Sequence, residues 1–194
     1  MRDKHCKLTL ATLLVLMLAA TASISASDQQ KESAAPAAQP AKGSPEMDRL
    51  KFYIGEWDYT ETYVKNSMHA NAAKNTGLYT SKVGPGGNSV VQTFHSQGPV
   101  GDFEGLLVIT WDPYEKAYKE YLFASDFPRC YMATGQFEGD ELVFRGSVSM
   151  GDRMSMALRN TTKLVAPGKI SSATYAAVNG APEELMVTVD AVKR

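Results

Sequence analysis

The sequence predicts an all-β fold: a ten-stranded antiparallel up-and-down barrel with a short N-terminal helical turn. Three observations carry this prediction. Segments of about 8–12 residues rich in Val, Thr, Tyr and Phe recur from residue 57 onward. Gly, Pro, Asn and Asp separate these segments, and almost no stretch shows the period of a helix. Each segment follows the previous one through a tight turn, which favours antiparallel neighbours.

The helical turn is expected over residues 45–55, PEMDRLKFYIG, because Pro45 suits a first turn and Gly55 ends it. The ten strands then follow in order. They are expected at residues 57–64, 75–83, 89–97, 103–111, 117–125, 130–137, 142–150, 153–165, 169–178 and 184–192.

Ten consecutive strands form either a sandwich or a barrel. A flat sheet of that width would expose two edges, and closure into a barrel removes both. Two strands alternate poorly, since GLLVITW at 105–111 is apolar on both faces and RNTTK at 159–163 is polar on both. Such blurred alternation is typical of a barrel with a large, partly polar cavity, because the interior of that barrel need not be dry.

The first 45 residues are not expected to belong to the barrel. Residues 1–26 combine a basic head, the apolar run LTLATLLVLMLAA and a small-residue end, which predicts a cleaved secretory signal peptide. The run is shorter than the roughly 20 residues of a membrane anchor. Residues 27–45 have no large apolar side chain and predict a disordered linker. The folded domain is then 46–194, exported to the periplasm or the extracellular space.

Charge and cysteine content limit the function. The formal charge of −1 lacks the positive field that nucleic-acid binding needs. Without the signal-like run, nothing predicts membrane insertion of the mature chain. Only Cys130 remains after cleavage, so an intramolecular disulfide is excluded and the domain must depend on its hydrophobic core.

The motif Gly-x-Trp at Gly55 and Trp57, placed after a helical turn at the first strand, resembles the calycin superfamily of lipocalins and fatty-acid-binding proteins. The resemblance implies that Trp57 packs across the closed end of the barrel and that Gly55 lets the backbone bend there. The tracts LKFYIGEWDYTETY, GPGGNSVVQTFHS and LLVITWDPYEKAYKEY also resemble the domain-of-unknown-function family 1579, whose members are uncharacterised bacterial proteins. That resemblance covers about 46–194 and implies a fold rather than a reaction.

Catalytic motifs are scarce, so we assign no catalytic residue and expect a protein that is not an enzyme. No Gly-x-Ser-x-Gly motif is present, and nothing orders a Ser–His–Asp set around His95. Neighbouring carboxylates occur beside turns, where solvated charges are the simplest interpretation. These pairs are Asp102 and Glu104, Asp140 and Glu141, and Glu183 and Glu184.

We expect neither a bound cofactor nor a bound metal ion. Nitrobindin-like barrels of the superfamily bind haem through a histidine late in the chain, whereas the last histidine here is His95. Met150, Met154 and Met156 offer thioethers of the kind that bind copper(I), but methionine also packs well in apolar cores.

The remaining hypothesis is a binding cavity inside the barrel. Fatty-acid-binding relatives hold a carboxylate with arginine and tyrosine, so an inward arginine would indicate an anionic ligand, while an outward one would be an ordinary surface residue. The cavity candidates are Tyr63, His95, Tyr121, Arg145, Arg159 and Tyr175.

The sequence thus favours a non-catalytic carrier or binder of a small hydrophobic molecule. The alternative is a structural or protein-interaction barrel whose interior is filled by side chains. The third hypothesis is an enzyme that uses the cavity as its active site. A large cavity would favour the first, and a filled interior with an exposed apolar patch the second.

Overall fold

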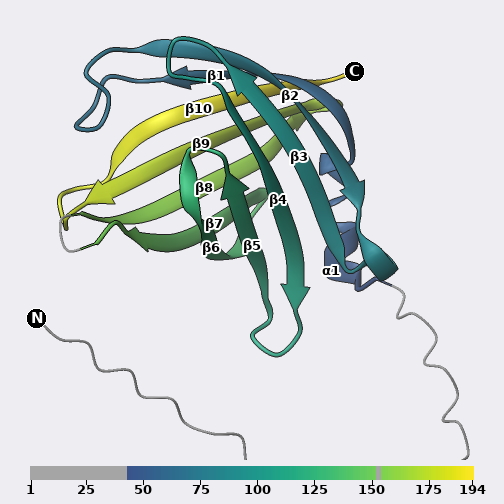
Figure 1. Ribbon diagram of the computed structural model, residues 1–194. Coiled ribbons are helices and arrows are strands. Elements are labelled where there is room, and N and C mark those ends of the chain that lie inside the picture. Colours follow the sequence, from purple (N-terminus) through teal and green to yellow (C-terminus); the bar gives the residue numbers. More distant parts are fainter. Residues whose placement is uncertain (1–42, 152–153) are drawn as a thin grey trace, which may run out of the picture. The chain divides into compact units, whose positions relative to one another are not determined.

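The computed structural model describes residues 43–151 and 154–194. In this part of the chain, ten antiparallel strands form one closed barrel in which each strand pairs with its sequence neighbours and β1 pairs with β10 (Figure 1). The predicted fold class is therefore confirmed. The predicted signal peptide lies outside the described residues, and so does the predicted linker up to residue 42.

The described elements agree closely with the expected ranges. They are α1 (Pro45–Asp48), the 3₁₀ turns η1 (Lys51–Tyr53) and η2 (Pro85–Gly87), and the strands β1 (Gly55–Tyr63), β2 (Ala73–Val83), β3 (Ser89–Gln97), β4 (Phe103–Asp112), β5 (Ala117–Ala124), β6 (Phe127–Glu138), β7 (Glu141–Ser149), β8 (Ser155–Ala166), β9 (Lys169–Val178) and β10 (Glu184–Lys193).

The largest difference from the expected ranges is the start of β6. The sequence DFPR suggests a turn up to residue 129, whereas β6 begins at Phe127. Phe127 pairs with Ala124 across a two-residue turn, and the register shifts between Leu122 and Ala124. A bulge at this point lets the strand begin earlier, with Pro128 near its start, where a missing amide proton costs least.

One end of the barrel is closed by the N-terminal segment, which lies beneath the lower end of β3 in Figure 1. The Ser44 hydroxyl accepts the Met47 amide proton and caps α1. Leu50, on the loop that joins α1 to η1, is completely buried. The predicted single helix is therefore a turn of α-helix followed by a 3₁₀ turn.

Gly55 and Trp57 lie at this closed end. The Trp57 indole is 1% exposed, and its Nε1 donates a hydrogen bond of 2.9 Å to the Tyr53 carbonyl, which ties β1 to η1. Gly55 begins β1 with φ of +136°, a region that side chains disfavour. A Cβ there would also meet the Lys193 side chain at 2.5 Å.

Alternating side chains point into and out of the barrel, as β1 illustrates. Trp57 and Tyr59 are buried, while Glu56 and Asp58 are exposed. The aromatic and aliphatic core is concentrated toward the closed end. In the described residues, no helix has the length and apolar character that crossing a membrane requires.

Candidate functional site

A cavity of about 240 Å³ lies inside the barrel and is partly open to solvent. Its wall includes side chains of the 3₁₀ turn η1 and of eight strands, so it lies inside the barrel rather than between two elements. The lining residues are Tyr53, Tyr59, Glu61, Tyr79, Gln92, Phe94, Leu107, Glu120, Leu122, Asn160, Thr162, Ile170, Ser172, Thr174, Val189 and Ala191.

Glu120 of β5 is the most unusual member of this wall. Its side chain is buried, with 7% of the residue exposed. The one hydrogen bond described for its carboxyl comes from Asn160 Nδ2 of β8, over 3.3 Å. Burial raises the pKa of the Glu120 carboxyl to about 7, and the Asn160 hydrogen bond opposes this only in part. Near neutral pH this carboxyl is therefore divided between its protonated and ionised forms.

Glu61 of β1 is the second carboxylate of the cavity, and it is better supplied with donors. Its Oε2 accepts hydrogen bonds of 2.6 Å from the Ser96 hydroxyl and of 3.1 Å from Tyr63 Oη. The Tyr63 ring also packs edge-on against His69, with 5.1 Å between the ring centroids. Glu61 is thus held in place, whereas most of the hydrogen-bonding capacity of Glu120 is free.

Asn75 extends the Glu61 network to the end of the barrel opposite α1. The Asn75 residue is completely buried, and its Nδ2 donates to the Ser96 hydroxyl over 3.3 Å and to the Gly101 carbonyl over 3.0 Å. Its Oδ1 accepts the Val100 amide proton over 3.2 Å. The side chain therefore ties the loop 98–102 to the end of β3.

Tyrosines supply much of the remaining wall. The rings of Tyr59 and Tyr79 lie 5.7 Å apart, and Tyr79 also stacks on Trp57 at the same separation. Burial raises the pKa of Tyr59 to about 12 and raises the pKa values of Tyr53 and Tyr79 as well. These hydroxyls stay protonated at physiological pH and act as neutral hydrogen-bonding groups.

Tyr131 of β6 carries a buried hydroxyl for which the structure gives no hydrogen-bond partner among the described residues. The residue is 5% exposed. Burial and, secondarily, the negative charge of Glu120 raise its pKa. Because buried polar groups are nearly always paired, an unpaired hydroxyl at this position is unusual.

The charged side chains that line the cavity are all acidic. Among the described residues that line the cavity, none is lysine, arginine or histidine, while Glu61 and Glu120 are both acidic. An anion that entered the barrel would meet two carboxyl groups and no compensating cation.

The structure corrects most of the sequence-based cavity candidates. Tyr63 does reach the interior network through Glu61. His95 is exposed, and instead lines an outer-surface hollow with Thr60 and Leu78. Tyr121 follows the inward Glu120 and pairs with Val108 and Met132 on the outer face. Strand alternation places both residues outside because their neighbours point inward.

Arg145, Arg159 and Tyr175 also lie on the outer face. Arg145 forms a 2.6 Å ion pair with Glu138, and Arg159 forms a 2.7 Å ion pair with Glu183. The Arg159 guanidinium also lies 3.9 Å from the centre of the Tyr175 ring. Both arginines are neutralised on the surface, so the hypothesis of an arginine anchor for an anionic ligand is wrong for this cavity.

The structure places the methionines of the copper hypothesis around the β7–β8 connection. Among the described residues, no cluster of three or more His, Cys, Asp or Glu side chains is placed to hold a metal ion. Met150 is 42% exposed at the start of the β7–β8 connection, and Met154 and Met156 are half-buried. Cys130 is a free thiol, as expected for a chain with one cysteine in the domain.

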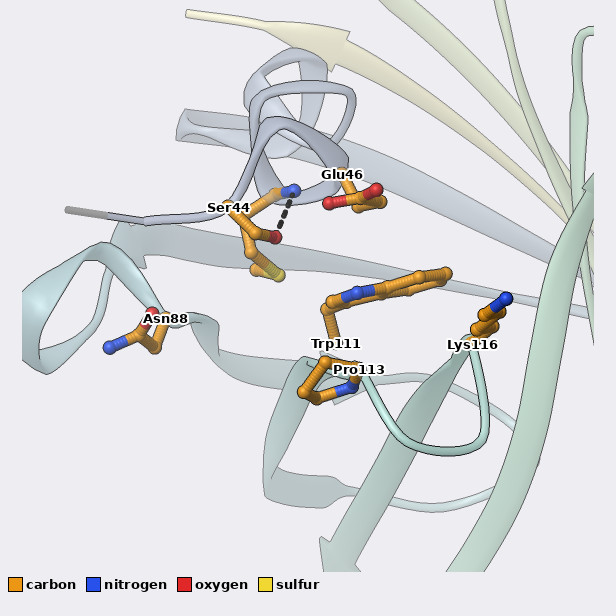
Figure 2. Close-up of a pocket in the computed structure, with 7 residues that line it drawn as sticks. Ser44, Glu46, Asn88, Trp111, Pro113 and Lys116 are labelled. Atoms are coloured by element: carbon orange, nitrogen blue, oxygen red, sulfur yellow. Dashed lines mark hydrogen bonds between the residues drawn. The ribbon is translucent and has the colours of Figure 1, made fainter. Parts of the chain in front are cut away.

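A second hollow, of about 630 Å³, lies outside the barrel at the closed end. Figure 2 shows the Trp111 indole between Glu46 and Pro113, with Lys116 at its edge. Pro113 and Lys116 are exposed, and Met47 is the one fully buried residue of the lining. Although this hollow is larger, its wall has no buried ionisable group, so we regard the interior cavity as the candidate site.

Glu61 and Glu120, the two carboxylates of the cavity, were not among the sequence-based candidates. Both are marked by strand alternation. Glu120 stands midway between Tyr118 and Leu122, and Glu61 comes two residues after Tyr59. A carboxylate at an apolar position of a period-2 pattern is the signal that identifies each of them.

The fold defines the class of the protein as a calycin-like β-barrel. Two solved structures are similar to it and support this class. The crystal structure of Rv2717c from M. tuberculosis has a TM-score of 0.58 and 10% sequence identity, covering 78% of this chain and 98% of that one. The S-type phycobiliprotein lyase CPES from Guillardia theta has a TM-score of 0.50 and 12% identity, covering 77% and 90%.

At these identities the two likenesses establish the fold alone. No protein-family model matches the chain, and no curated protein matches it. The resemblance to the domain-of-unknown-function family 1579 therefore stays a prediction.

Proposed function

We propose that the protein is a non-catalytic carrier or binder that holds one small molecule inside its barrel, and that it acts after export, in the periplasm or outside the cell. One observation carries the proposal. The interior contains a cavity of about 240 Å³ in which the carboxyl group of Glu120 is buried with a single long hydrogen bond. Natural proteins rarely bury a polar group in this way without a partner.

The size of the cavity limits what it holds. Sites for drug-sized ligands span about 300–1,000 Å³, so an occupant of this cavity is smaller than those ligands. The interior is also incompletely filled by side chains, which favours a carrier over an interaction barrel with a solid core. The mixture of Phe94, Leu107 and Val189 with hydroxyl and carboxyl groups suits a molecule that has an apolar body and one polar end.

Native mass spectrometry of the exported protein, followed by solvent extraction, tests this proposal. We expect one small molecule for each chain. The Ser172→Phe variant fills the cavity from β9 and should be isolated without that molecule, because Ser172 is on the wall. Ser171→Phe is the matched control, because the Ser171 hydroxyl binds Asp190 on the outer face. An empty wild-type barrel, or equal occupancy in both variants, would contradict interior binding.

A further inference from the structure

The cavity contains an acidic group that lacks a counter-charge. Glu120 accepts one hydrogen bond of 3.3 Å, whereas a carboxylate offers about four acceptor positions. The groups around it are Tyr53 of η1, Tyr131 of β6 and Asn160 of β8, and none of these carries a positive charge. A buried carboxylate is stable in its ionised form only when a cation or several donors face it.

The second carboxylate of the cavity strengthens the requirement for a positive charge. Glu61 lines the same cavity from β1, and its Oε2 is already occupied by Ser96 and Tyr63. With its Oε2 held by these two donors, Glu61 adds negative potential to the same cavity. Together the two carboxylates make the interior a poor environment for an anion and a favourable one for a cation.

The aromatic part of the cavity wall also favours a cation. Tyr59, Tyr79 and Phe94 line the cavity with Glu61 and Glu120. The faces of aromatic rings attract cations, and combinations of aromatic faces with carboxylates recognise ammonium groups. The hydroxyls of Thr162 on β8 and of Ser172 and Thr174 on β9 line the same cavity as Asn160 and supply further hydrogen-bonding positions.

We propose that the molecule held in the barrel is a small organic amine, whose ammonium group pairs with Glu120 and whose apolar body lies against the aromatic wall. This inference rests on the proposed function, since it requires binding inside the barrel. It goes further by assigning the charge of the molecule and the anchoring residue.

Three probes that share one aromatic ring separate charge from shape: 2-phenylethylamine, 2-phenylethanol and phenylacetate. Isothermal titration calorimetry at about pH 8, where Glu120 is mostly ionised, measures their affinities. We expect the amine to bind at least about tenfold more tightly than the alcohol, and phenylacetate to bind weakest. Glu120→Gln should weaken the amine by at least about tenfold and leave the alcohol unchanged.

Glu104→Gln is the matched control because Glu104 is an exposed carboxylate on β4. It should leave all three affinities unchanged. Equal affinities for the amine and the alcohol, or an amine affinity that Glu120→Gln does not change, would overturn the inference. The absence of binding by every probe would overturn it too.

Proton release on binding distinguishes direct pairing of Glu120 with the amine from a merely structural role. A structural role would release no proton. At about pH 7, roughly half of the Glu120 carboxyls carry a proton, and pairing with an ammonium group expels it. Titrations of 2-phenylethylamine in buffers of different ionisation enthalpy should therefore report about half a proton released, and none in Glu120→Gln. The tyrosines that face Glu120 stay protonated, and Glu61 keeps its donors Ser96 and Tyr63.

The failure of this inference is distinguishable from the failure of the proposed function. If all three probes bind with equal affinity and Ser172→Phe abolishes their binding, the barrel is a carrier without charge preference. If no probe binds but native mass spectrometry finds a neutral or anionic molecule in the wild-type barrel and not in Ser172→Phe, the carrier proposal stands and the amine inference falls.

Discussion

Replacing Glu120 with glutamine should stabilise the empty barrel at alkaline pH. The raised pKa means that the folded barrel keeps a proton on Glu120 between about pH 4.5 and pH 7, while the unfolded chain releases it. Rising pH therefore destabilises the folded state across this window. Glutamine has nearly the same shape, retains an oxygen that can accept the Asn160 hydrogen bond, and has no charge to bury.

The size of the effect follows from the two pKa values. A rise from the ordinary value of 4.5 to about 7 corresponds to about 3 kcal/mol, at about 1.4 kcal/mol for each pKa unit. The side chain is almost completely buried, so solvent screening reduces this value little. Because proton binding and stability are linked, the full stability difference between the two proteins is present above about pH 7. At pH 5 it is less than about 1 kcal/mol.

Urea unfolding, followed through the fluorescence of Trp57 and Trp111, measures the two free energies of unfolding at about pH 5 and about pH 8. Glu120→Gln should be more stable than the wild type by about 3 kcal/mol at the higher pH alone. Glu104→Gln, on the outer face, should show no such dependence. If the stability gain of Glu120→Gln is absent at pH 8, or equally large at pH 5, then ionisation of the buried Glu120 carboxyl does not destabilise the fold, and the reasoning is refuted.

Three further predictions concern the two ends of the barrel and its outer face. Asn75→Ala should cost about 2–4 kcal/mol, because it leaves half-buried backbone groups of the loop 98–102 unpaired, and hydrogen exchange of that loop should accelerate. Leu50→Ala should cost about 2–5 kcal/mol in urea unfolding, because it opens a void under the closed end. Arg159→Met should change neither stability nor the amount of co-isolated small molecule appreciably, because its ion pair lies on the surface.

Each of the first two variants has an adjacent control. Thr76→Ala changes an exposed position beside Asn75, and Lys51→Ala changes an exposed position beside Leu50. Both controls should unfold like the wild type. A control that destabilises the barrel as much as its partner would show that the loss is not specific to the buried contact. Loss of the co-isolated molecule in Arg159→Met would restore the arginine-anchor hypothesis.

The arrangement of strands was predictable because it depends on local signals. Turn residues end each strand, and β-branched and aromatic residues fill the segments between them, so the boundaries of β3 and β9 agree with expectation residue for residue. The start of β6 was missed because a bulge admits a proline close to the strand end. Composition alone does not reveal a bulge.

The site was harder to predict because it depends on which face of each strand points inward. Arg145 and Arg159 stand among apolar neighbours, but those strands also have apolar side chains on their outer faces, so the local pattern does not fix direction. The partner that neutralises Arg159 is Glu183, which lies beyond the next strand, β9, in the sequence. Strand alternation from Trp57 does mark Glu61 as inward, and the same reasoning from Tyr118 marks Glu120.

A crystal structure of the barrel grown with 2-phenylethylamine tests the central claim most directly. We expect the ammonium nitrogen to lie within about 2.7–3.2 Å of a Glu120 carboxylate oxygen, with the ring inside the barrel beside Tyr79 and Phe94. An empty interior, or an amine bound only in the outer hollow beside Trp111, would contradict it.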